Sequence, residues 1–207
     1  MDKIRDYLQW DRVQKKLLEA GLNLFSLHDF VHEFGVARGA AIKFLSRHKK
    51  RGDIEQLKRG LYALSLQTPS LYRVASRLYR PSYISFETAL SHYGLIPETV
   101  YAFTSATPKT SQEFEALGNV FTYHKIKPSA YSGYKPMKMD GHTILIATPE
   151  KAVVDFLYFV SLGKKLLNDR LQVEGLDSKE LEKHAKAFER PGILDALDRL
   201  PAGLEVF

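Results

Sequence analysis

The 207-residue sequence contains no cysteine. This absence excludes disulfide bonds, thiolate nucleophiles and every zinc site that uses cysteine ligands. The absence of cysteine also agrees with a reducing compartment, where proteins do not rely on disulfide bonds. Any chemistry of this protein therefore has to come from its other polar residues.

The sequence also lacks a long hydrophobic run. Its longest apolar stretch, residues 152–162, is about eleven residues long and contains Asp155, whereas a membrane-spanning helix needs about twenty. The first ten residues mix charged and apolar side chains, and they lack the apolar centre of a signal peptide. We therefore expect a cytoplasmic protein, with enough hydrophobic residues (44%) to form a core.

Acidic residues are scarce in one segment, and this segment accounts for the net charge of +6. Residues 38–59 contain eight lysines and arginines but only Asp53 and Glu55 as acids. Residues 67–207 are nearly neutral, with 17 basic and 16 acidic residues. A basic run is often only a solvated surface, but a local excess beside a helix-turn-helix pattern is typical of phosphate binding.

Apolar residues recur at helical spacing in three segments near the N-terminus. Ser26 precedes the second segment, and Asp29 follows three residues later, which is close to the pattern of a capping box. Gly35 ends this short helix, and two residues later the next helix begins at Arg38. A short helix, a tight glycine turn and a third helix predict a helix-turn-helix unit. The predicted helices span residues 11–20, 26–34 and 38–50.

Two strand-like segments follow the third helix. Residues 53–57 and 61–64 are rich in apolar residues, and the basic turn Lys58-Arg59-Gly60 separates them. Three helices followed by a hairpin predict a winged helix, with Lys58 and Arg59 at the tip of the wing.

The remainder of the chain predicts a second, mixed α/β domain. Pro69 marks a linker, and Ser85 is placed to cap a helix that begins at Phe86. Pro149 stands at the first turn of a strong helix, where proline is favoured. The predicted helices are 71–78, 86–93, 150–162, 178–188 and 191–199, and the predicted strands are 100–105, 119–124 and 143–147 in a sheet of three to five strands. We therefore predict an α+β protein with a winged-helix domain over residues 1–66 and an α/β domain over residues 70–207.

The second helix of a helix-turn-helix lies in the major groove of DNA, and its first residues reach base edges. Arg38 and Lys43 face outward early in this helix and are our candidates for guanine O6 and N7. The outward set also contains Ile42 and Ser46. Five further residues are predicted to contact phosphates, which gives a slope of about −4 to −5 for log K against log salt. These five are Arg47, Lys49, Lys50, Lys58 and Arg59.

Other patterns that could support chemistry are weak. His28 and His32 have the spacing of a metal-chelating pair, but the sequence between them does not match a zinc-protease motif. Glu150 and Asp155 point in different directions on one helix, and Lys151 has no acidic nuclease motif before it. No phosphate-binding glycine loop is present. We therefore predict no catalytic residue, no metal and no cofactor, and we interpret the many aromatic residues as core.

Three sequence segments together resemble the AbiEi antitoxin family. The wing closes with RGLYAL at residues 59–64, residues 75–98 read ASRLYRPSYISFETALSHYGLIPE, and residues 148–158 read TPEKAVVDFLY. The resemblance covers most of residues 26–160. It implies a winged helix that binds operator DNA and represses its own operon, through Arg38, Lys43, Arg47, Lys58 and Arg59. It also implies that the C-terminal domain counters a nucleotidyltransferase toxin of a type IV, abortive-infection (phage-defence) system.

Two alternatives stay open beside this resemblance. The first is a stand-alone winged-helix regulator whose C-terminal domain senses a ligand, and a nucleotidyltransferase gene next to this one would argue against it. The second is a nucleic-acid enzyme that the winged helix targets to DNA. It requires a catalytic cluster of Asp, Glu, His or Lys in the second domain, and the sequence shows none at motif spacing.

Overall fold

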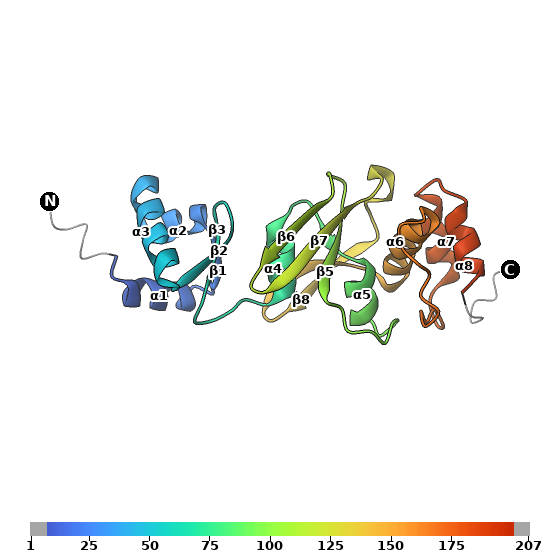
Figure 1. Cartoon of the computed structure of the whole chain (residues 1–207), viewed down its shortest axis with the longest axis horizontal. Coiled ribbons are helices and arrows are strands. Elements are labelled where there is room, and N and C mark those ends of the chain that lie inside the picture. Colours follow the sequence, from blue (N-terminus) through green and yellow to red (C-terminus); the bar gives the residue numbers. More distant parts are fainter. Residues whose placement is uncertain (1–7, 201–207) are drawn as a thin grey trace. The chain divides into compact units, whose positions relative to one another are not determined.

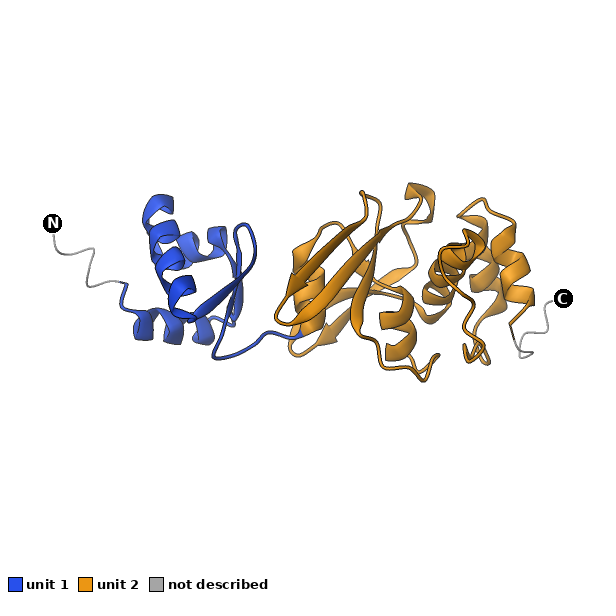
Figure 2. Cartoon of the chain, viewed as in Figure 1, with its two compact units in different colours: residues 1–70 blue, residues 71–207 orange. Residues whose placement is uncertain are grey.

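The computed structural model of this chain describes residues 8–200. Residues 1–7, which include most of the N-terminal segment considered as a signal peptide, lie outside the described part. The chain divides into two compact units, residues 1–70 and residues 71–207 (Figure 2). Figure 1 shows the helices and strands of both units.

The first unit combines three helices with a three-stranded antiparallel sheet in the strand order β1-β3-β2. This order of elements is the one expected of a winged helix-turn-helix. The short strand β1 was not predicted, because three residues are too few for a periodic pattern, and its pairing with β3 defines it. The elements are α1 (Trp10–Glu19), β1 (Leu24–Ser26), α2 (Leu27–Phe34), α3 (Arg38–Arg51), β2 (Ile54–Lys58) and β3 (Leu61–Leu64).

The predicted start and end of α2 are confirmed. The Ser26 Oγ atom accepts a hydrogen bond from the Asp29 backbone N–H at 3.1 Å, and Asp29 Oδ2 accepts one from the Ser26 N–H at 2.8 Å. This reciprocal pair satisfies two N–H groups that a helix otherwise leaves free. Gly35 ends the helix in the left-handed conformation (φ 60°), which glycine adopts without steric cost.

The core of the first unit holds α3 in place. The buried residues Ala41, Phe44 and Leu45 of α3 pack in one cluster with side chains from the other two helices and the sheet. His48 adds a polar anchor, because its ring stacks on Trp10 at 4.4 Å between centroids and its Nδ1 atom lies 2.7 Å from Asp53 Oδ2. One face of α3 is thus fixed against the domain, and the other is left to solvent.

The second unit is built on a six-stranded mixed sheet in the order β6-β7-β5-β4-β9-β8, so the prediction of three to five strands is wrong. The strands that were missed are the two-residue β4 and the two edge strands β6 and β8. Edge strands need no apolar face and carry charged residues or proline, as in QEFEA and YKPMKM. The strands are β4 (Tyr83–Ile84), β5 (Ala102–Thr107), β6 (Gln112–Ala116), β7 (Asn119–Lys125), β8 (Tyr134–Met139) and β9 (His142–Ala147).

Helices cover both faces of this sheet. Alternate residues of a strand point to opposite faces, and the ring of Phe103 on β5 contacts Tyr72 of α4, whereas Thr104 bonds to Thr88 of α5. The five helices lie close to their predicted ranges, and a short 3-10 turn (Pro128–Ala130) adds to them. The helices are α4 (Leu71–Leu78), α5 (Phe86–His92), α6 (Pro149–Ser161), α7 (Ser178–Lys186) and α8 (Gly192–Asp198).

The expected capping role of Ser85 is wrong in one respect. Ser85 does occupy the position before α5, but its hydroxyl makes no capping bond. It donates instead to Asp155 Oδ2 at 2.6 Å. The side chain of Thr104, on the neighbouring strand, accepts the hydrogen bond from the Thr88 N–H in the first turn of α5. The Thr88 N–H group at the start of α5 therefore finds its acceptor on the sheet and not on the residue that precedes the helix.

Candidate nucleic-acid interface

The position of α3 separates its residues into two faces. Ala41, Phe44, Leu45 and His48 are buried, so the opposite side of the helix carries the remaining residues. The centre of that outer side is a stripe of residues three or four apart, which share one helix face. The stripe consists of Gly39, Ile42, Lys43, Ser46 and Lys50, and all five are exposed. A helix that displays such a stripe can lie along the major groove.

The predicted base-contacting residues lie differently on this surface. Lys43 stands in the central stripe, next to Ile42, whose side chain is 45% exposed although it is large and apolar. Arg38 is the first residue of α3 and lies at one edge of the stripe, whereas Arg47 lies at the other edge. The arrangement places a cation and an apolar side chain together, which suits a guanine edge and a thymine methyl group respectively.

The N-terminal end of α3 carries no negative group. The residue before the helix is Ala37, which offers no side-chain cap, and the first turn contains no acidic residue. This differs from α2, whose first turn is closed by Ser26 and Asp29. The exposed N–H groups and the positive end of the helix dipole at α3 are therefore compatible with a phosphate.

The basic residues at the other end of α3 have two interpretations. Lys49, Lys50 and Arg51 are all exposed, and cations in the last turn stabilise a helix by complementing its dipole. Lys49 also donates a hydrogen bond to Gln56 Oε1 of β2 at 2.9 Å. This contact ties Lys49 to the wing, so among these residues Lys50 is the best oriented for DNA, because it continues the central stripe.

The turn of the wing is one residue shorter than the sequence predicts. Lys58 is the last residue of β2 and is half-buried, so the prediction that it lies at the tip is wrong; the turn itself is Arg59-Gly60. Arg59 is exposed, and Gly60 has a φ of 79°, which glycine tolerates. The Gly60 carbonyl accepts a hydrogen bond from the Leu27 N–H at 2.9 Å. This bond holds the tip against the start of α2.

One residue of this surface was missed by reasoning from the sequence. Gly39 lies in the central stripe, and a Cβ atom added there would meet no atom within 4 Å. Its φ does not lie in the left-handed region, so the fold does not require glycine at this position. A glycine that the fold does not require, on an exposed helix face, lets another molecule approach the backbone closely. The sequence signal that could have revealed this residue was a glycine within a segment of helical spacing.

The remaining site predictions can be located as well. His28 and His32 lie side by side on α2, with their ring centroids 6.4 Å apart. Within residues 8–200, no group of three or more His, Cys, Asp or Glu side chains is placed to hold a metal ion. Across the same residues, every helix is too short or too polar to span a membrane.

Comparison with known proteins agrees with the geometry of the first unit. Residues 12–65 match the model of a family described as transcriptional regulator, AbiEi antitoxin. The chain matches no curated protein. The matched segment runs from α1 to the end of β3, so it includes the whole candidate interface, and the motifs at residues 75–98 and 148–158 lie outside it. The winged-helix part of this chain is therefore similar to the AbiEi antitoxin family of transcriptional regulators, as its sequence motifs indicated.

Proposed function

We propose that this protein binds operator DNA of its own promoter through α3 and the wing, and acts as a transcriptional autorepressor. The observation that carries the proposal is the outer face of α3, which combines Lys43 and Lys50 with Ile42 and contains no acidic residue. An acid there would repel the phosphates, which carry one negative charge for about every 1.7 Å of duplex. The family description supports the same conclusion independently.

In this proposal the residues of α3 and the wing have separate roles. Arg38 and Lys43 donate to guanine O6 and N7, while Ile42 contacts a thymine methyl and Ser46 reaches a neighbouring base edge. The other cations position the domain on the phosphates and supply affinity without sequence information. They are Arg47, Lys49, Lys50, Lys58 and Arg59.

We further propose that residues 1–66 form the DNA-binding domain and that residues 70–207 form the domain responsible for antitoxin action against a nucleotidyltransferase toxin. The family description supports the antitoxin role. Co-expression with the neighbouring toxin gene, scored for rescue of growth, tests this part. A chain lacking residues 70–207 should bind the promoter but fail to rescue.

A band-shift titration on the native promoter tests the DNA-binding proposal directly. We expect tighter binding to the promoter than to a scrambled duplex of the same length. Because about five cations meet phosphates, log K should fall with log salt at a slope of about −4 to −5. Equal affinity for both duplexes at every salt concentration would contradict the proposal.

Replacing Gly39 by alanine is expected to stabilise the first unit and weaken promoter binding at the same time. Alanine is favoured over glycine in a helix by about 0.5–1 kcal/mol, and the new methyl group meets no atom of the protein. The same methyl group would stand at the N-terminal end of the helix face that approaches DNA, where the first residues of the helix reach base edges. We expect the melting temperature to rise by about 2–6 °C and the affinity for the promoter to fall several-fold.

Gly192→Ala is the matched control for this variant. Gly192 begins α8 in the second unit, also with a φ outside the left-handed region, and a Cβ atom there would make only an ordinary contact with Ser161 at 3.5 Å. This variant should bind the promoter like the native protein. If Gly39→Ala also binds with native affinity, the first turn of α3 does not lie close to the DNA.

A further inference from the structure

A pocket of about 390 Å³ opens in the second unit, on the side of the sheet that α5 covers. This volume lies within the range of small-molecule sites, which are about 300–1,000 Å³. Strands β5 and β7, α5 and the loop after α6 contribute to its wall. Its lining includes the polar residues Glu87, Glu98, Thr104, Thr122, His124 and Lys165.

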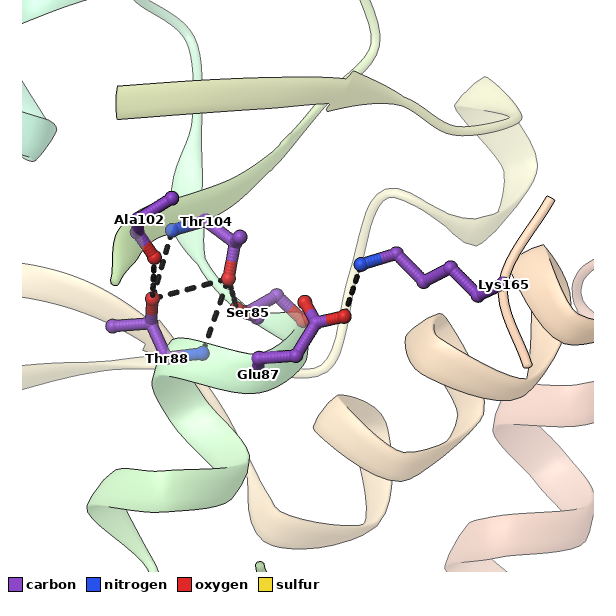
Figure 3. Close-up of polar contacts among 6 residues, drawn as sticks. All are labelled: Ser85, Glu87, Thr88, Ala102, Thr104 and Lys165. Carbon is purple, nitrogen blue, oxygen red and sulfur yellow. Dashed lines mark hydrogen bonds and ion pairs between the residues drawn. The ribbon is translucent and has the colours of Figure 1, made fainter. Parts of the chain in front are cut away.

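A closed set of hydrogen bonds joins the start of α5 to β5 beside this pocket (Figure 3). Thr104 Oγ1 accepts a bond from the Thr88 N–H at 3.1 Å and donates to the Ser85 carbonyl at 2.8 Å. Thr88 Oγ1 accepts a bond from the Thr104 N–H at 2.8 Å and donates to the Ala102 carbonyl at 3.3 Å. These bonds tie the first turn of α5 to β5, so Glu87, which stands in that turn, is held in one orientation.

Three oxygen atoms at the pocket have no partner among the described residues, and one of them is Glu98 Oε2. Glu87 pairs with Lys165 through Oε1 only, and its Oε2 atom is buried and makes no hydrogen bond. The Thr122 Oγ1 atom, on β7 beside Thr104, is also buried and makes none. A buried polar atom without a partner costs free energy of about 1–3 kcal/mol. All three atoms can accept a hydrogen bond, so a molecule that brings donors would satisfy them.

The charged groups around the pocket are paired. Desolvation favours the neutral form of Glu98, but hydrogen bonds from its own backbone N–H and Asn168, together with the Arg170 charge, hold its pKa below the ordinary value. Burial, together with the charge of Lys165, lowers the pKa of His124 to about 4, so its ring is neutral near pH 7. Each of the two carboxylates therefore has one cationic partner, Lys165 for Glu87 and Arg170 for Glu98, and each keeps one oxygen atom without a hydrogen bond.

We propose that this pocket binds an organic cation, a ligand whose ammonium or guanidinium group donates to Glu87 Oε2 and Thr122 Oγ1. The apolar stem of such a ligand would lie along Ile96, Val100 and the highly exposed ring of Tyr101. An anion is disfavoured because the free carboxylate oxygens can only accept hydrogen bonds. The cation can come from a free amine or from a lysine or arginine side chain of a partner protein. The site does not depend on the DNA-binding proposal, since all its residues lie in the second unit.

Calorimetric titration of the full chain, without DNA, tests this site. Agmatine serves as the free cation, the peptide acetyl-Gly-Arg-Gly-amide as the side-chain form, and glutarate as the anionic control. We expect saturable binding of at least one cation at micromolar to millimolar concentration and none of glutarate. Agmatine binding indicates a free ligand, and binding of the peptide alone indicates a partner's side chain. Absence of binding by both cations overturns the proposal.

Thr122→Val separates recognition from folding. Its hydroxyl has no partner to lose, so the variant should unfold at or above the native temperature, yet bind the cation about fivefold more weakly. Glu87→Gln should weaken binding at least tenfold because it removes a charged acceptor. Thr143→Val, at an exposed position on β9, is the matched control and should bind as the native chain does. Native affinity in Thr122→Val would place the cation elsewhere and overturn the proposal.

Discussion

Replacing Asp155 by alanine is expected to destabilise the second unit by about 3–5 kcal/mol, the typical cost of removing one partner from a buried ion pair. Asp155 is fully buried on α6, and its Oδ1 atom lies 2.5 Å from the ammonium of Lys151, which is 1% exposed. Its Oδ2 atom accepts hydrogen bonds from Tyr83 at 2.9 Å and Ser85 at 2.6 Å. The variant would leave three donors without an acceptor, and one of them is charged.

A second variant separates the cost of leaving Lys151 without its partner from the cost of lost packing. The double change Lys151→Met and Asp155→Leu removes both charges and replaces them by apolar groups of similar size, which is often neutral for buried pairs. The Lys151 ammonium lies 4.4 Å from the centroid of the Phe188 ring, and a methionine side chain would keep an apolar contact there. The Tyr83 and Ser85 hydroxyls still lose their acceptor in the double variant, so we expect it to recover only the part of the stability that the unpaired Lys151 charge costs in Asp155→Ala.

Urea unfolding tests this prediction when it is followed by a signal of the second unit that does not depend on tryptophan. Promoter binding is measured on the same variant. Trp10, the one tryptophan of the chain, belongs to the first unit and reports on that unit alone. If the two units are separate domains, Asp155→Ala should leave the Trp10 transition and promoter affinity unchanged. A loss below about 1 kcal/mol would show that the pair contributes little. Loss of promoter binding would contradict the proposed division into domains.

Replacing both Arg38 and Lys43 by alanine is expected to lower affinity for the promoter about a hundredfold. A good contact between a basic side chain and guanine contributes about 1–3 kcal/mol of discrimination, and well-separated contacts are roughly additive. Both side chains are exposed, so the stability of the first unit should change by less than about 0.5 kcal/mol. Affinity for scrambled DNA should fall much less, and the preference for the promoter should largely disappear.

The control for this variant must remove the same charge elsewhere. Arg12→Ala with Lys15→Ala removes two exposed cations from α1, so a purely electrostatic effect of net charge would appear equally in both double variants. Band-shift titrations at one fixed salt concentration compare them. If both variants weaken promoter binding to the same extent, Arg38 and Lys43 are not base contacts, and the surface binds DNA through charge alone.

The first unit could largely be predicted from its sequence because its determinants are local. Ser26 and Asp29 cap a helix within one turn, Gly35 ends it, and the apolar residues of α3 repeat at helical spacing. The motif RGLYAL covers the turn of the wing and β3, the last strand of this unit. Each of these signals acts between residues that are close in the chain, so a periodic or short pattern was enough to locate the helices and the hairpin.

Only the tertiary structure decided the second unit's polar sites. The spacing of Lys151 and Asp155 was visible in the sequence, but their burial depends on Tyr83 and Ser85, which lie about 70 positions earlier. The pairing of Glu87 with Lys165 likewise joins residues 78 positions apart. Long-range pairing of this kind follows from the order of the strands, in particular the parallel contacts of β5 with β7 and β4 with β9. The sequence by itself determined a basic, capped helix-turn-helix. The Lys151–Asp155 pair is local to α6, but its burial, like the pocket, exists only because the sheet brings distant residues together and removes water from between them.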